Sequence, residues 1–204
     1  GLWRFEDSAD NMKATVGTDM VGSGASFTGP WTVIEPGFTD GRVAQISEWG
    51  TLQTYHGIAA NGGGSKVNEY TIVIDYCQTS DLGQWNALLQ VDTDAHGSDA
   101  EFWTSPTGQI GVGAVGYSDL TYDPATWHRI AFSVDNGNFW RAYVDGVLFL
   151  DGAGQDIDGR FALNEYFHLF GDNTWSEVGW GLCGTVAVWS RAMDSTEIAD
   201  LGGW

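Results

Sequence analysis

The stretch TWHRIAFSVDNGNFWRAYVDGVLFLDG, residues 126–152, decides the fold because polar and apolar side chains alternate along two parts of it. The alternation covers residues 129–135 and residues 139–146, and the turn DNGN separates the two runs. Successive side chains of a β-strand point to opposite faces, so this period predicts two antiparallel strands, each with one buried face. The predicted inward side chains are Ile130, Phe132, Val134, Trp140, Ala142 and Val144.

Further alternating segments lie on both sides of this stretch. They cover residues 70–77, 86–92 and 185–190. About a dozen strands of this kind fit into the chain, which is too many for one open, twisted sheet. We therefore expect an all-β fold in which two antiparallel sheets pack face to face as a sandwich, in a single domain that spans residues 1–204.

One short helix is predicted at the C-terminal end, in the segment MDSTEIADL, residues 193–201. Asp194 is placed to act as the N-cap, and Glu197, three residues later, completes a capping box. Ile198 and Leu201 form an apolar pair on this helix. Because the helix is short and terminal, we expect it to cover an open end of the sandwich.

The charge of the chain excludes several classes of partner. Its 204 residues carry 8 Lys and Arg against 27 Asp and Glu, so the formal net charge is −19. Such a surface repels phosphate backbones and anionic lipids, so neither nucleic acid nor a membrane surface is an expected partner. No segment approaches the roughly 20 consecutive apolar residues that a membrane-spanning helix needs.

Three segments together resemble a known superfamily. The stretch quoted above is similar to the laminin G-like, concanavalin A-like pattern, with Trp-His, an alternating strand, a turn and a strand that ends in YVDG. The segment GTVAVWSRAMDSTEIADLGG, residues 184–203, resembles the last strand and closing helix of that superfamily, and LWRFED, residues 2–7, resembles its first strand. The resemblance implies a concanavalin A-like jelly roll whose first and last strands run antiparallel, side by side.

The resemblance also implies a range of functions, because this fold hosts lectins, carbohydrate-binding modules, adhesion domains, glucanases and polysaccharide lyases. The Glu-x-Asp-x-x-Glu motif of the glucanases is absent, and we find neither the Arg-rich strand nor the Gln-x-His strand of the alginate-lyase type. The favoured hypothesis is a lectin-like, carbohydrate-binding module of a larger secreted or cell-surface bacterial protein, linked covalently to other modules. A polysaccharide-degrading lyase or glycoside hydrolase, and a non-catalytic adhesion or spacer domain, are the alternatives.

A sugar-binding surface needs aromatic rings for the apolar face of a sugar and planar polar groups for its hydroxyls. The positions predicted to point outward from the strands supply that mixture, and two aromatic residues on neighbouring segments could border the same face. The candidate ligand-binding residues are Asn86, Gln90, Asp92, Trp103, Tyr117, Arg129, Arg141 and Tyr143. For the arginines, pairing across the strands with Asp75 or Asp92 is the competing structural role.

A structural calcium ion is the expected cofactor. If the first and last strands lie side by side, as the resemblance implies, Asp7, Asp10, Asp172 and Glu177 could meet at one rim of the sandwich. Calcium takes six to eight oxygen ligands and is often bound by converging carboxylates. The competing interpretation is a solvated acidic rim, which a chain of this charge would show without any ion.

The run DTDAHGSDAEF, residues 92–102, is a second acidic candidate. Asp92, Asp94, Asp99 and Glu101 crowd into it, but the spacing breaks after Asp94 and the flanks are predicted strands, so it is no EF-hand loop. We expect Asp92 to face outward and contact the ligand, and the segment from Asp94 to Glu101 to form a solvated loop at the edge of the site.

The two cysteines, Cys77 and Cys183, allow one disulfide. If the strand over residues 70–77 runs antiparallel to the last strand, both cysteines lie at the same end of the sheet, where a bridge is feasible. Two buried thiols would look the same in the sequence, so both states remain open.

Overall fold

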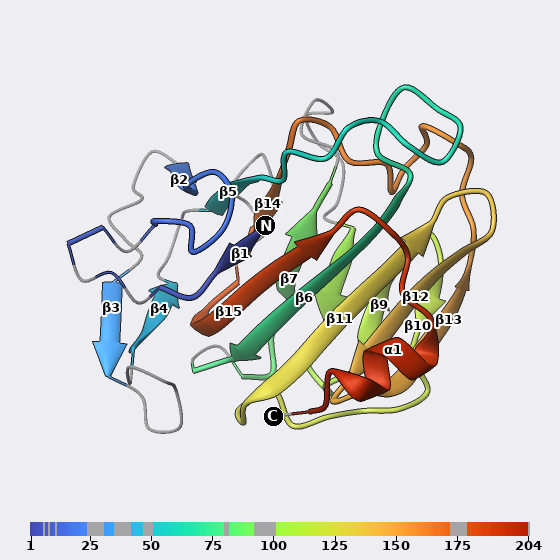
Figure 1. Ribbon diagram of the computed structural model, residues 1–204. Helices are drawn as coiled ribbons and strands as arrows, with labels where there is room; N and C mark the ends of the chain where they lie inside the picture. Colours follow the sequence, from blue (N-terminus) through green and yellow to red (C-terminus); the bar gives the residue numbers. More distant parts are fainter. Residues whose placement is uncertain are drawn as a thin grey trace.

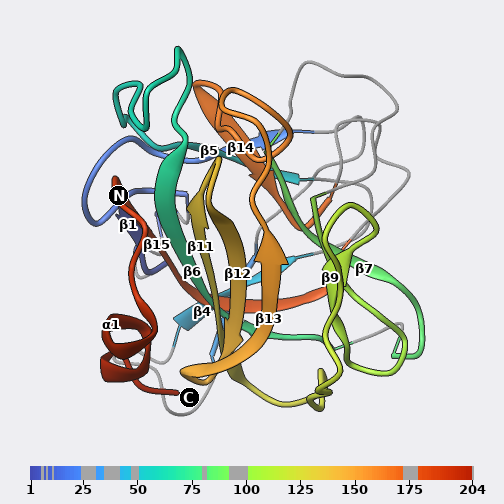
Figure 2. The same cartoon turned by 90° about the vertical axis from the view of Figure 1, so that its right-hand side faces the viewer.

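A computed structural model describes residues 1–5, 7, 9–10, 12–23, 31–34, 42–46, 51–79, 82–91, 101–171 and 179–203, with the side chains of residues 23, 31–34 and 42 excepted. Over these residues the chain forms two antiparallel β-sheets that pack against each other, with one short helix on the outside (Figures 1 and 2). The predicted fold class, a two-sheet antiparallel jelly-roll sandwich with a C-terminal helix, is confirmed.

Sheet A is the larger sheet, and its strands follow the order β13-β12-β11-β6-β15-β4-β3, with β1 beside β15. Its strands are β1 (Leu2–Trp3), β3 (Trp31–Ile34), β4 (Arg42–Ile46), β6 (Glu69–Cys77), β11 (His128–Asp135), β12 (Phe139–Val144), β13 (Val147–Ala153) and β15 (Gly181–Trp189). The pairing of Leu2 with Ala187 confirms that the first and last strands run antiparallel, side by side.

Sheet B follows the order β10-β9-β8-β7-β14-β5-β2. Its strands are β2 (Val21–Ser23), β5 (Thr51–Tyr55), β7 (Asn86–Gln90), β8 (Phe102–Thr104), β9 (Ile110–Val112), β10 (Gly116–Tyr117) and β14 (Tyr166–Leu169). Neighbours in the sheet are often far apart in the chain, since β14 lies between β7 and β5. Residues from distant segments therefore meet on each face of sheet B.

The core lies between the two inner faces. Every predicted inward side chain of the segment 126–152 is buried there, and β11 pairs with β12 in the register that the alternation requires. Aromatic rings join the two layers: Phe102 of β8 lies 5.1 Å, centroid to centroid, from Trp140 of β12. Full burial of one such side chain contributes about 1.5–3 kcal/mol, so this aromatic core is a main source of stability.

The helix α1 (Ser195–Asp200) has the predicted capping box. The Asp194 side chain accepts the backbone N–H of Glu197, and the Glu197 side chain accepts the backbone N–H of Asp194. The sequence led us to expect that α1 covers an open end of the sandwich, and this expectation is wrong. The helix lies on the outer face of sheet A, in front of β11 and β12 in Figure 1. The reason is apolar burial, because Ile198 and its neighbours complete a small second core. That core contains Val73, Ala131, Tyr143, Met193 and Ile198.

The two cysteines are buried thiols and form no disulfide with each other. The strands β6 and β15 are antiparallel, and both cysteines do lie at the same end of the pair. However, Cys183 is opposite Tyr76, whose side chain points into the core, whereas Cys77 is one position further and points to the outer face. A disulfide needs Cβ atoms about 3.5–4.5 Å apart, which two opposite faces of one sheet do not allow.

Within the described residues, no helix has the length and apolar character to cross a membrane.

Candidate functional site

The outer face of sheet B carries a row of polar and aromatic side chains. On β14, Phe167 and Leu169 point into the core, so Tyr166 and His168 must point outward. The register places Tyr166 beside Tyr55 of β5, and His168 between Gln53 of β5 and Gln90 of β7. We call this row the polar strip; its members are Gln53, Tyr55, Gln90, Tyr166 and His168.

Hydrogen bonds and ring contacts order the polar strip. Gln53 donates to the hydroxyl of Tyr55 over 2.7 Å, and the Nδ1 atom of His168 is hydrogen-bonded to the Thr51 hydroxyl over 2.7 Å. The rings of Tyr55 and Tyr166 lie 5.4 Å apart, centroid to centroid. His168 and Gln90 are buried, whereas both tyrosines are half-buried and present part of their rings to solvent.

At the other edge of the same face, three rings form what we call the aromatic cluster: Trp85, Trp103 and Tyr117. Trp85 is 50% exposed, and its ring lies 5.2 Å from that of Tyr117 and 6.4 Å from that of Trp103. Trp103 and Tyr117 both pair with Gly111 in the strand register, so their side chains lie on the same face of sheet B. A Cβ atom at Gly111 would lie 2.2 Å from the Gly116 carbonyl oxygen, so the close pairing of these strands requires glycine.

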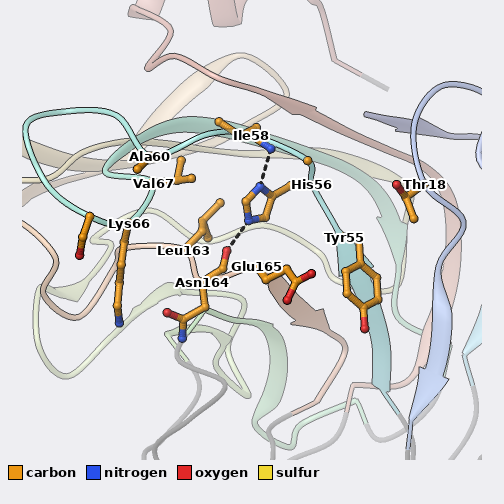
Figure 3. A pocket seen from close by; sticks show the side chains of 12 residues that line it. Thr18, Tyr55, His56, Ile58, Ala60, Lys66, Val67, Leu163, Asn164 and Glu165 are labelled. Carbon is orange, nitrogen blue, oxygen red and sulfur yellow. Dashed lines mark hydrogen bonds between the residues drawn. The ribbon is translucent and has the colours of Figure 1, made fainter.

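A pocket of about 480 Å³ opens at the rim, where β5 ends and β14 begins (Figure 3). We call it the rim pocket. One wall is apolar, and the groups that face it in Figure 3 include the carboxylate of Glu165, which lies between Asn164 and Tyr55. The lining residues are Thr18, Tyr55, His56, Gly57, Ile58, Ala60, Ser65, Lys66, Val67, Leu163, Asn164 and Glu165.

His56 holds two walls of the rim pocket together. Its Nδ1 atom accepts the backbone N–H of Ile58 over 3.0 Å, so the proton is on Nε2, which donates to the backbone oxygen of Asn164. Burial lowers the pKa of His56 below its ordinary value, and the bond to Asn164 opposes this only in part. The imidazole is therefore neutral, and its tautomer is fixed by the backbone that it connects.

A second brace fixes the far wall of the rim pocket. Asp158 accepts a hydrogen bond from the side chain of Asn68, from the backbone N–H groups of Ser65 and Lys66, and from the Ser65 hydroxyl, over 2.7–3.0 Å. These donors, Asn68 first, hold the pKa of Asp158 well below its usual range. The turn that carries Ser65 and Lys66 is thus tied to a segment more than ninety residues away in the chain.

The structure divides the predicted ligand-binding residues between the two sheets. Trp103, Tyr117 and Gln90 share the outer face of sheet B, and the first two meet in the aromatic cluster. Asn86 belongs to sheet B but points inward, where it donates to the Tyr76 hydroxyl over 2.6 Å. Its expected role at the surface is corrected, because a buried amide at the strand end satisfies a core hydroxyl.

The other three described candidates lie on the outer face of sheet A. Tyr143 is fully buried beneath α1, so it cannot be the exposed stacking ring that the sequence suggested. Arg129 makes two hydrogen bonds to Asp75, over 2.7 and 3.0 Å, and a third to the Leu201 carbonyl oxygen, which is the competing structural role. Arg141 pairs with Asp151 over 2.6 Å and remains partly exposed.

The acidic candidates are only partly described. Asp92, Asp172 and Glu177 lie outside the described residues, as do Asp94 and Asp99. Asp7 and Asp10 are exposed, and each accepts a backbone N–H within its own turn. No group of three or more His, Cys, Asp or Glu side chains that could hold a metal occurs in the described part of the chain.

The sequence predicted that Glu101 belongs to a solvated loop, and the structure corrects this prediction. Glu101 is buried, accepts the backbone N–H of Val91 over 2.7 Å and lies 3.7 Å from Arg160. A buried carboxylate needs such partners, so Glu101 is a structural residue that connects the start of β8 to Val91, which follows β7.

Comparison with known proteins identifies a family and several similar folds. A family model described as the concanavalin A-like lectin/glucanases superfamily (Laminin_G_3) matches residues 54–199. Domain 4 of AbnA, a GH43 extracellular arabinanase from Geobacillus stearothermophilus, solved in complex with arabinotriose, has a TM-score of 0.61 at 19% identity. The likeness covers 98% of this chain and 96% of that domain. No curated protein sequence matches the chain.

Two further similar structures come from sialidases. The CBM40 of the Ruminococcus gnavus IT-sialidase, bound to α2,3-sialyllactose, has a TM-score of 0.53 at 16% identity, over 79% of this chain and 96% of that one. Trypanosoma rangeli sialidase in complex with the inhibitor DANA has a TM-score of 0.58 at 13% identity, over 78% of this chain and 27% of that one. At these identities the likeness shows a shared fold.

Proposed function

Because the chain belongs to the concanavalin A-like lectin/glucanase superfamily, we propose that it is a carbohydrate-binding module that holds a glycan on the outer face of sheet B. The observation that carries this proposal is the aromatic cluster, in which a half-exposed tryptophan is held by two further rings. Structural neighbours that are carbohydrate-binding or glycoside-hydrolase domains, two of them solved with bound oligosaccharides, support it.

The aromatic cluster supplies the main contact in this proposal. A sugar ring has an apolar face of C–H groups, which packs on a flat aromatic ring, and an edge of hydroxyls. Trp85 offers the flat ring, and its contacts with Trp103 and Tyr117 reduce the side-chain entropy that binding would otherwise cost. The polar strip lies on the same face, and its partly exposed members, Gln53, Tyr55 and Tyr166, offer amide and hydroxyl groups for the hydroxyls of further sugar residues.

The test is affinity electrophoresis through gels that contain one neutral polysaccharide each. We expect retardation in at least one gel, and Trp85→Ala should weaken it by about 2 kcal/mol, or about 30-fold in Kd, as for a central tryptophan in an interface. The matched control is Leu82→Ala, an equally exposed apolar residue of the same turn outside the aromatic cluster. Equal effects of the two substitutions would contradict the proposal.

A polysaccharide-degrading enzyme is the second candidate. One observation favours it: Tyr166 and His168, two groups that can transfer protons, lie on the same outer face with ring centroids 5.6 Å apart. An enzyme releases reducing ends or unsaturated products from the polysaccharide that it binds. A module that retards in a gel and releases neither during long incubation would exclude this candidate.

We also propose that the protein is secreted or displayed at the cell surface as one module of a larger protein, and that it holds a structural calcium ion. The acidic composition and the exposed turn that carries Asp7 and Asp10 support the calcium proposal. Since the described residues alone contain no metal-binding group, the proposal requires Asp172 and Glu177 to complete the site.

A further inference from the structure

We propose that the rim pocket is a second carbohydrate site, separate from the aromatic cluster, and that it takes one or two neutral sugar residues. The proposal rests on the proposed carbohydrate-binding function and adds a second point of attachment to it. It is carried by the shape of the rim pocket, by two charges of opposite sign that line it, and by the braces that fix its walls.

The rim pocket and the aromatic cluster are too far apart for one sugar residue to touch both. Tyr117 lies on β10 and Tyr55 on β5, five inter-strand steps apart in sheet B. At about 4.8 Å a step, this separates them by roughly 20 Å or more. They also lie towards opposite strand ends, since Trp85 precedes β7 and Glu165 precedes the antiparallel β14. The rim pocket is therefore a place separate from the aromatic cluster.

The lining of the rim pocket matches the two-sided chemistry of a sugar. An apolar wall that can contact the C–H groups of a sugar is formed by Ile58, Val67 and Leu163. Hydroxyl and amide groups are provided by Tyr55, Ser65 and Asn164. The volume of about 480 Å³ falls in the range of roughly 300–1,000 Å³ that is typical of small-molecule sites. A pocket of this size can hold the end of an oligosaccharide, but not the flat face of an extended polysaccharide chain.

The charges of the rim pocket favour a neutral sugar. Lys66 and Glu165 both line it, and neither takes part in an ion pair among the described residues. A carboxylate can accept two neighbouring hydroxyls, and an ammonium group can donate to a third, so each charge has a role toward a polyol. A sugar acid would instead meet Glu165 and the field of a chain with net charge −19.

Hydrogen bonds within the chain fix the walls of the rim pocket. His56 connects the backbone at Ile58 to the backbone at Asn164, and Asp158 connects Ser65 and Lys66 to the opposite segment. A site with pre-set walls avoids part of the ordering cost of binding, which matters for a small ligand with few contacts.

Two-dimensional ¹H–¹⁵N NMR tests the proposal, with arabinotriose, xylotriose and cellotriose as neutral probes and trigalacturonic acid as the acidic probe. We expect at least one neutral trisaccharide to produce saturable shifts of the Lys66 and Glu165 amides. The indole N–H of Trp85 reports on the aromatic cluster in the same spectra. Trigalacturonic acid should shift the amides of the rim pocket at least about tenfold more weakly.

Variants assign the shifts to the two charges. Glu165→Gln and Lys66→Met should each weaken binding in the rim pocket by about tenfold and leave the Trp85 titration unchanged. Asp200→Asn on α1 and the exposed Lys13→Met are the matched controls, and both should bind as the parent protein does.

Each of the other results overturns the proposal. Shifts confined to Trp85 and its neighbours would leave the proposed function standing and remove the second site. No shift in either region with any neutral probe would contradict both. A stronger response of the rim pocket to trigalacturonic acid would contradict its assignment to neutral sugars.

Discussion

Arg129 is predicted to be a residue of stability and not of ligand binding, and Arg129→Met tests this directly. In the structure its guanidinium makes two hydrogen bonds to Asp75, whose side chain is only 2% exposed, and one to the carbonyl oxygen of Leu201 at the end of α1. The substitution would leave a buried carboxylate without its partner and would release the helix end. Loss of one partner of a fully buried pair costs about 3–5 kcal/mol.

Because the Arg129 side chain is itself 27% exposed, we expect a cost at or below the lower end of that range, about 2–3 kcal/mol in the free energy of unfolding. For a chain of this length this lowers Tm by roughly 5–10 °C. Guanidinium chloride unfolding, followed by tryptophan fluorescence, measures the cost, and affinity electrophoresis measures binding on the same sample.

Two comparisons make the prediction for Arg129 specific. Arg141→Met removes an exposed pair with Asp151 and should cost less than about 1 kcal/mol. Adding Asp75→Asn to Arg129→Met should recover part of the lost stability, since the amide no longer leaves a buried charge. Unchanged unfolding with lost glycan binding would refute the structural role and return Arg129 to the ligand site.

Three further predictions concern pH, thiols and metal. Since burial lowers the pKa of His56 in the folded state, the unfolded chain binds more protons below pH 6.5, and the free energy of unfolding should decrease as the pH is lowered through this range. His56→Gln should flatten this slope in denaturation curves, and an unchanged slope would contradict the prediction. Thiol titration should find two reactive thiols in the denatured, unreduced protein and almost none in the native protein, because Cys77 and Cys183 are buried; no thiol after denaturation would show that they are bridged. If calcium is bound, chelation should lower Tm by several degrees, and an identical melt in both conditions would remove the calcium proposal.

Local features of the fold were predictable because their signals lie within short segments. The inward residues of β11 and β12 follow from alternation, and the capping box of α1 follows from Asp194 and Glu197 three positions apart. The position of α1 was not predictable in this way. It depends on Val73 and Tyr143, which form an apolar patch on the outer face of sheet A only after β6 and β12 have joined that sheet.

The candidate site was harder to predict because alternation shows on which side of a strand a residue lies, but not in which sheet. Gln90 and Arg141 both point outward from their strands, yet β7 belongs to sheet B and β12 to sheet A, so the two lie on opposite sides of the sandwich. Trp85 lies before the first residue of β7, outside the strand, where no period applies. The rim pocket joins residues 55–67 to residues 163–165, a contact that no local pattern indicates.

The cysteines also show that alternation alone does not predict which side chains meet across two strands. The condition set for a bridge is met, because their strands pair antiparallel and both cysteines lie at one end of the pair. The register sets Cys183 opposite Tyr76 and so separates the two thiols by the thickness of the sheet. A shift of one position reverses the face of a side chain, and the alternation of each strand alone does not fix that register.

The most direct test of the central claim compares Trp85→Ala with Arg141→Ala, because the two residues lie on opposite faces of the sandwich and only one face is proposed to bind glycan. Calorimetric titration with oligosaccharides from the polysaccharide that retards the protein gives Kd for each variant. We expect Trp85→Ala to weaken binding by about 30-fold and Arg141→Ala to leave it within about twofold. Loss of binding in Arg141→Ala, with Trp85→Ala unaffected, would place the glycan on sheet A and contradict the account.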